Sequence, residues 1–166
     1  MHLYELCQWL QSTGWATGIR ESLNLYPALY TLHIFGFVIM VTATSVLDLR
    51  VLGLGLKSRS ISEVARLTLP WAEAGLVANL ATGFLVFAAQ AVDMYTNTAF
   101  RFKIAMVVVA GANIFMLERA IKGSEEKWQE PGKTPSSIQW SAVISILLWF
   151  GIVAMSRVIG FTGARE

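Results

Sequence analysis

Four long apolar runs, separated by polar segments, dominate the pattern of residues along the chain. A helix rises about 1.5 Å per residue, so about 20 apolar residues cross a hydrocarbon core of roughly 30 Å. Backbone groups inside a membrane must bond within their own segment, so each run should be a helix. The expected spans are residues 27–48, 71–92, 100–118 and 139–160. The chain is therefore predicted to be all-α, a single transmembrane domain over residues 1–166 built as an integral membrane four-helix bundle.

The residues before the first span show a different pattern. Leu3, Leu6 and Leu10 share one helical face, while polar residues occupy the others. This pattern is typical of an interfacial amphipathic helix, which lies along a membrane rather than across it. Gly14 and Gly18 are expected to loosen the chain after this N-terminal helix.

The connector before the second span carries a helix start signal. Ser60 and Glu63 have the spacing of a capping box, in which each side chain bonds a free backbone N–H of the first turn. A short helix is therefore expected to begin near Ile61. Pro70 and Trp71 should then lead from it into the second span.

Composition supports a membrane protein and excludes some partners. Hydrophobic residues make up 55% of the chain and charged residues only 14%, whereas soluble domains average about 25% charged residues. The net charge of +2 is too small to indicate nucleic acid as a partner. The lipid bilayer is the expected partner, together with a homo-oligomer or a larger membrane complex.

The distribution of lysine and arginine predicts the orientation. The connectors after the first and third spans hold eight of these residues, and the opposite side holds five. Because loops on the cytoplasmic side are enriched in positive residues, both termini should lie outside. For a bacterial cell this means a multi-pass protein of the inner membrane with both termini in the periplasm.

Several unusual polar residues fall on that same outer side. His33 lies inside the first span, Arg101 and Lys103 open the third, and Met155 and Arg157 close the fourth. Ionisable residues inside a span are costly, so they indicate a functional site by default.

His33 is the residue best suited to bind a cofactor. It is the only histidine within a span, and Gly36 lies one turn away, where a missing side chain leaves room for a flat macrocycle. Haem b needs an imidazole and in some proteins a second axial ligand. Met155 or Met106 would supply that second ligand; otherwise the iron is five-coordinate or shared across a dimer. The alternative is a histidine that hydrogen-bonds between helices, with Gly36 serving close packing.

Three basic residues suit the carboxylate edge of a haem. Arg101, Lys103 and Arg157 are the candidates to neutralise the propionates. The alternative is that these side chains reach the membrane surface as ordinary flanking charges.

Other polar residues of the spans fit helix packing better than chemistry. Small and polar residues at a spacing of four on the second span predict a buried helix–helix contact. These residues are Gly75, Asn79 and Gly83, and the same interpretation applies to Asn113, Ser141 and Ser145. At the inner end of the first span, Asp48 and Arg50 are expected to form an interfacial charge pair.

Short motifs carry a resemblance to known families. The segments 32–36 (LHIFG), 48–54 (DLRVLGL) and 102–104 (FKI), with Asn113 after the last, resemble an uncharacterised family of small bacterial inner-membrane proteins. A histidine early in one span and a lysine opening a later one are also similar to HemJ-type protoporphyrinogen oxidases and to CopD-type copper-resistance domains. The HemJ-type resemblance implies haem b on His33 and a functional lysine at Lys103.

Three functions follow as hypotheses. The first is a haem b redox protein that transfers electrons near the outer membrane face. The second is a cofactor-free accessory or anchoring subunit of a larger membrane complex. The third is copper handling, which the CopD-type resemblance implies but which the scarcity of Cys and His disfavours. The sequence contains no Ser-His-Asp order, phosphate loop or paired intramembrane carboxylates, so it predicts no reaction type.

Overall fold

A computed structural model describes residues 3–122 and 134–162 of the protein. Four of the helices in these residues are long and apolar enough to cross a membrane, which confirms the predicted four-span, all-α architecture. The helices are α1 (Leu3–Ser12), α2 (Gly14–Glu21), α3 (Leu25–Val51), α4 (Ile61–Ala89), α5 (Ala91–Thr96), α6 (Thr98–Lys122) and α7 (Ser136–Thr162). The four candidate spans are α3, α4, α6 and α7.

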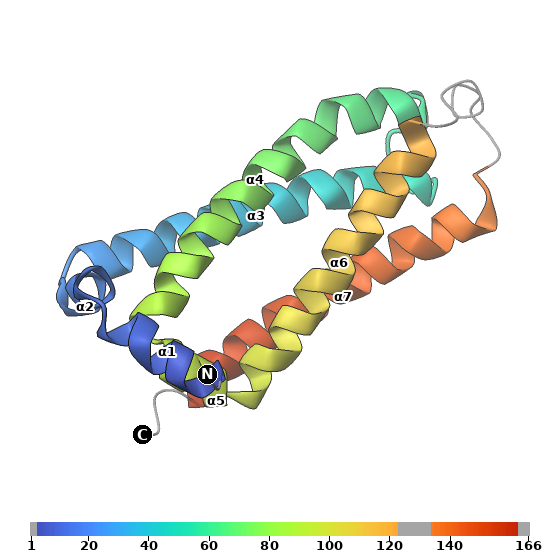
Figure 1. Ribbon diagram of the computed structural model, residues 1–166. Helices are drawn as coiled ribbons and strands as arrows, with labels where there is room; N and C mark the ends of the chain where they lie inside the picture. The colour runs from blue at the N-terminus through green and yellow to red at the C-terminus, as the bar shows by residue number, and fades with distance from the viewer. Residues whose placement is uncertain (1–2, 123–133, 163–166) are drawn as a thin grey trace.

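The spans are arranged as two antiparallel pairs (Figure 1). Helix α3 packs mainly on α4, and α6 packs mainly on α7, while α3–α7 and α4–α6 contacts join the pairs. Helices α1, α2 and α5 gather at the end where α3 begins and α4 ends (Figure 1). We call this the terminal end of the bundle, and the opposite end the loop end.

Two local features differ from the expectation. The short helix near Ile61 and the second span are one continuous helix, α4, with Pro70 inside it. A proline removes one helical hydrogen bond, but neighbouring helices and local adjustments allow it within a membrane segment. The Ser60 side chain caps this helix by accepting from the Glu63 backbone N–H, as predicted. Gly14 begins the helix α2 instead of a loose connection.

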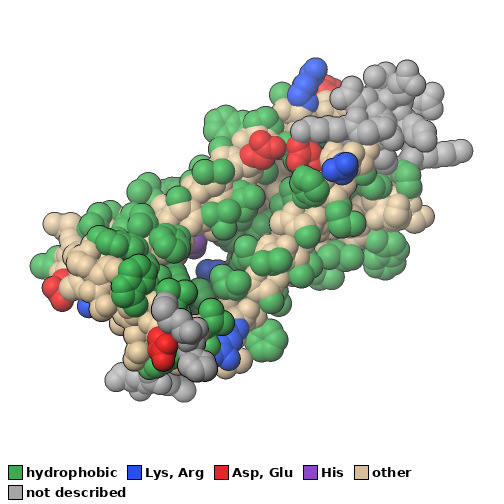
Figure 2. All heavy atoms as spheres, in the orientation of Figure 1, with side chains coloured by type: hydrophobic (Ala, Val, Ile, Leu, Met, Phe, Trp, Pro, Cys, Tyr) green, Lys and Arg blue, Asp and Glu red, His purple; other side chains and the backbone are tan. Residues whose placement is uncertain are grey.

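The buried core consists of two apolar clusters. One lies toward the loop end and contains Leu47 and Val51 of α3 with residues of the other three spans. The other, which we call the middle cluster, contains Met40, Ala110, Trp149 and Ile152 and therefore joins both helix pairs. Large apolar side chains also cover the outside of the spans (Figure 2), as contact with lipid requires.

Small residues let the helices of each pair approach closely. A Cβ atom added to Gly75 would lie only 2.8 Å from the Gly36 carbonyl oxygen and from the Met40 backbone nitrogen. In the other pair, the Asn113 amide donates to the Ser141 carbonyl at 3.0 Å and accepts from the Ser141 hydroxyl at 2.8 Å. These contacts confirm the packing roles predicted for Gly75, Asn113 and Ser141.

Candidate functional site

The imidazole of His33 is held against α4 by its Nδ1 atom. This atom lies 3.1 Å from the Asn79 carbonyl oxygen and 3.2 Å from the Thr82 hydroxyl. The Asn79 side chain in turn donates to the His33 carbonyl at 2.9 Å, so the two residues interlock α3 and α4. Because a carbonyl can only accept, the bond to Asn79 places the hydrogen of a neutral His33 on Nδ1 and leaves Nε2 with a lone pair.

The room beside the ring comes from Gly83 rather than Gly36. A Cβ atom on Gly83 would lie 2.9 Å from His33 Cε1 and 4.0 Å from Nε2. A Cβ atom on Gly36 would instead meet the α4 backbone, 3.2 Å from the Asn79 nitrogen. Gly36 therefore serves helix packing, and the Nε2 atom is the ring nitrogen that lies farther from α4. Within the described residues, Nε2 has no hydrogen-bond partner.

Lys103 is the charged residue associated with His33. It lies on α6, about 7.5 Å along the helix from Thr98, and is half-buried. Its charge is close enough to act electrostatically on the His33 ring. The ion pair found in the described part of the chain joins Arg59 to Glu63, and no hydrogen bond from Lys103 is formed there. Lys103 is thus an unpaired cation inside a span.

The space-filling view locates the surroundings of this site. Figure 2 shows the molecule hollowed between the α3–α4 pair and the α6–α7 pair, with histidine and basic side-chain atoms at the edge. We call this region the hollow. One turn from His33, Phe37 meets Trp149 edge-on with ring centroids 5.9 Å apart. Since Phe37 packs on the middle cluster, apolar side chains fill the bundle on the loop-end side of the hollow.

The other predicted site residues do not take part in the electrostatic interaction between His33 and Lys103. Arg101 is exposed, donates to the Tyr95 carbonyl at 2.9 Å and stacks over its ring. Arg157 is also exposed and stacks over Phe161, with its guanidinium carbon 5.4 Å from the ring centroid. Met155 is half-buried on α7. The structure therefore brings His33 and Lys103 together and leaves both arginines engaged with their own neighbours.

Met106, the other methionine considered as a ligand, packs against α7. Its Sδ atom would lie 3.1 Å from a Cβ atom added to Gly151. Its side chain belongs to the apolar surroundings of the middle cluster.

Three residues of the site are not evident from the sequence. The pattern predicts Asn79 and Gly83 only as helix contacts and gives no role to Thr82. The sequence signal that could have found them is the i, i+3, i+4 spacing of polar and small residues on one face of α4, at the depth of His33.

The expected Asp48–Arg50 charge pair is wrong. Two residues apart on a helix, these side chains point in different directions. The Arg50 Nε atom donates to the Arg59 carbonyl at 2.6 Å, and Asp48 faces Ser145 of α7 instead.

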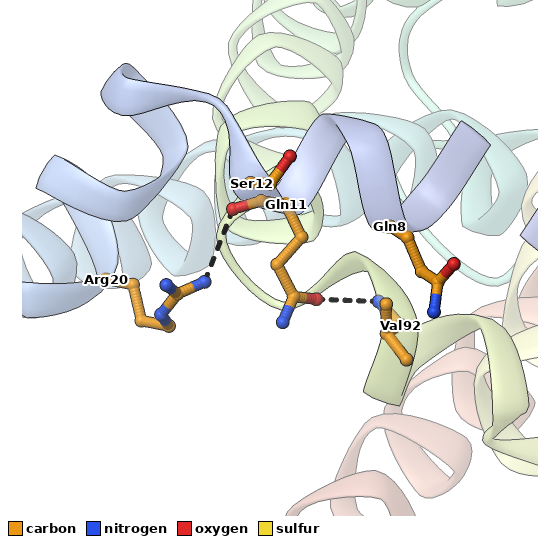
Figure 3. Close-up of a pocket in the computed structure, with 5 residues that line it drawn as sticks. All are labelled: Gln8, Gln11, Ser12, Arg20 and Val92. Carbon is orange, nitrogen blue, oxygen red and sulfur yellow. Dashed lines mark hydrogen bonds between the residues drawn. The ribbon is translucent and has the colours of Figure 1, made fainter. Parts of the chain in front are cut away.

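A separate, open pocket of about 270 Å³ lies at the terminal end (Figure 3) and is lined by Gln8, Gln11, Ser12, Arg20 and Val92. The Gln11 side-chain oxygen accepts from the Val92 N–H at 2.8 Å. The Arg20 guanidinium donates to the backbone carbonyls of Gln11 and Ala89 at 3.4 and 3.3 Å. Since these bonds join α1 and α2 to the α4–α5 junction, the polar groups here fasten the N-terminal helices to the bundle.

The donor atoms of the described residues limit the metals that the protein could hold. These residues include no group of three or more His, Cys, Asp or Glu side chains that could bind a metal ion. An iron already held by a porphyrin needs as few as one protein ligand, which a single histidine can supply.

Comparison with known proteins identifies a family but no characterised relative. Residues 23–162 match the model of a family of unknown function, DUF6644. No curated protein and no solved structure matches the chain. The matched residues begin just before α3 and end with α7, so the match covers the four long helices of this chain.

Proposed function

Because the chain belongs to this family of unknown function, we propose its function from the site itself: it binds haem b at His33 and transfers electrons near one membrane face. The observation that carries the proposal is the state of the His33 ring. Its Nδ1 atom is bonded to the Asn79 carbonyl, while Nε2 has no partner in the described part. Metal-binding histidines commonly donate their other ring N–H to a carbonyl or carboxylate, which fixes the tautomer and the ring orientation.

Lys103 gives the second support. A cation in a span needs an anionic partner or access to water, and Lys103 has no such partner among the described residues. The carboxylates of a haem would supply one. The exposed Arg101 and Arg157 would then act at the rim, after leaving their present contacts with Tyr95 and Phe161.

The surroundings of the hollow suit an apolar macrocycle. Apolar and polarisable side chains lie one to two turns from His33 toward the loop end: Phe37, Trp149 and Met106. A bound haem would supply an iron that gains and loses one electron. His33 would orient the macrocycle, and Lys103 would neutralise its carboxylates. The middle cluster would limit the access of water. Met155 remains the candidate for a second axial ligand.

The proposed setting is the inner membrane of a bacterial cell. The distribution of Lys and Arg supports a periplasmic position for the terminal end, and with it for the site. A homo-oligomer or a larger membrane complex would provide the electron partner.

A second function rests on the same bonds. The interlocked His33 and Asn79 also fasten α3 to α4, which is what a cofactor-free anchoring subunit would need. Copper handling is the weakest hypothesis, because the described residues include no group of three or more His, Cys, Asp or Glu side chains that could bind a metal ion.

An absorbance spectrum of the purified protein tests the proposal. Expressed with adequate haem supply, the wild type should show a Soret band, and His33→Ala should lose it while remaining folded. Asn113→Ala is the matched control, since it removes an equivalent polar contact from the other helix pair and should keep the band. A wild type without a Soret band contradicts the haem proposal and favours the anchoring subunit.

A further inference from the structure

A second unusual group lies in the other half of the bundle. Asp48 is on α3, fifteen residues from His33, or about 22 Å along the helix. Its side chain is 2% exposed. It lies between Leu47 and Val51 in the sequence, both of which belong to the apolar cluster near the loop end. A carboxyl group is thus buried among apolar side chains in a candidate membrane span.

The Asp48 carboxyl is poorly supplied with polar partners. The Ser145 hydroxyl of α7 interacts with it, and within the described residues its Oδ2 atom is buried without a hydrogen-bond partner. The hydroxyl of Thr44, one turn earlier, is already bonded to the carbonyls of Met40 and Val41. Helix α3 therefore offers no further donor to this carboxyl.

Among the described residues, no charged group on the surrounding helices forms an ion pair with Asp48. On α3, Arg50 is turned to the Arg59 carbonyl. On α4, Glu63 pairs with Arg59, and Arg66 is exposed. Near the loop end, α6 carries Glu118 and the exposed Arg119. Helix α7 has no charged residue from Ser136 to Ser156.

We propose that Asp48 is a proton-binding site in the interior of the bundle, where a neutral carboxylic acid donates its O–H to the Ser145 hydroxyl. A charged carboxylate here would have one hydroxyl donor and no cation, which is a costly state for a buried charge. The neutral acid satisfies its donor and leaves only a carbonyl oxygen without a partner. The proton thus makes the observed arrangement of α3 and α7 stable.

The bound proton also links the two helix pairs. Asp48 belongs to the α3–α4 pair, and Ser145 belongs to the α6–α7 pair. Release of the proton would leave a carboxylate that needs water or a cation, and either one requires the pairs to separate at this level. Proton release is therefore coupled to opening of the interface between the pairs. This inference is independent of haem at His33.

Infrared spectroscopy of the full chain in lipid vesicles tests the assignment, with the proton as the only ligand. At neutral pH, the wild type should show the C=O stretching band of a protonated carboxylic acid, and strongly alkaline pH should remove it. Asp48→Asn should lack the band. Asp93→Asn, a control at an exposed carboxyl on α5, should retain it. A wild type without the band, or Asp48→Asn with it, overturns the proposal.

A second variant covers the case in which Asp48→Asn does not fold. Ser145→Ala removes the hydroxyl that we propose accepts the Asp48 proton and keeps the carboxyl, so the band should remain but change in frequency. A band at the wild-type frequency in Ser145→Ala would mean that the protonated acid is elsewhere, and would refute the assignment to Asp48.

Discussion

At the scale of single residues, the candidate site depends on two side chains with opposite needs. His33 has one ring nitrogen bonded to α4 and the other without a partner in the described residues. Lys103 has a charge, and no anion balances it among residues 3–122 and 134–162. A ligand with an apolar body, a metal centre and carboxylates at one edge would meet both needs. This combination favours haem over a ligand with only one of these features.

Lys103 should affect how firmly haem is held, whereas His33 should decide whether it binds. A hydrogen bond to a charged group contributes about 1.5–3 kcal/mol, or roughly ten- to a hundredfold in affinity. We therefore expect Lys103→Met to bind haem more weakly by about that factor and to keep a Soret band at high haem concentration. Haem titration of the apoprotein, followed by absorbance, measures the change.

The control for this titration is Arg157→Met. Arg157 is exposed and already stacked over Phe161, so its replacement should change haem affinity less than that of Lys103. Equal effects of the two variants would show that general positive charge, rather than the position of Lys103, holds the haem.

At the scale of helices, the α3–α4 pair is the frame of the site. The close approach at Gly36 and Gly75 sets the spacing of the two helices, and this spacing allows Asn79 and Thr82 to reach the His33 ring. A side chain inserted at the glycine contact would therefore act on the site from a distance, by separating the helices that orient the ring.

Gly75→Ala should destabilise the bundle. Its Cβ atom would lie 2.8 Å from backbone atoms of Gly36 and Met40, and backbone cannot move aside as a flexible side chain can. Overpacking of this kind typically costs about 1–3 kcal/mol. We expect a lower midpoint of thermal unfolding in detergent. Gly160→Ala, where an added Cβ meets nothing within 4 Å, should leave the midpoint near that of the wild type. Matching midpoints for the two variants would contradict the close contact.

The sequence predicted the helices better than the site. Apolar runs of sufficient length allow only helices in a membrane, so the four spans followed directly from the pattern. The role of Gly83 did not, because it depends on the rotation of α4 against α3, which places Gly83 beneath His33 and turns Gly36 toward the α4 backbone. The Asp48–Arg50 pair failed for a related reason: adjacent charges in the sequence turn to different neighbours once α7 packs beside α3.

At the scale of the whole molecule, the two polar groups lie at different depths on either side of the middle cluster. His33 and Lys103 are toward the terminal end, and Asp48 is toward the loop end. The arrangement of the helix pairs therefore separates a proposed electron-transfer site from a proposed proton-binding site. Which site faces which compartment depends on the orientation of the bundle.

Cysteine labelling can determine that orientation. In a Cys7→Ser background, Thr96→Cys reports the terminal end and Ser58→Cys the loop end; both positions are exposed. Position 58 follows one span and position 96 follows two, so the two positions should lie on opposite sides of the membrane. Because the connectors of the loop end hold more Lys and Arg, a membrane-impermeant maleimide should label position 96 in intact cells. Position 58 should react only after permeabilisation. Ser124, which lies outside the described residues, should behave like position 58 because α6 separates it from position 96.

Labelling of positions 58 and 96 from the same side would contradict the four-span topology. Labelling of position 58 alone in intact cells would show that the bundle has the opposite orientation, with the His33 site facing the cytoplasm.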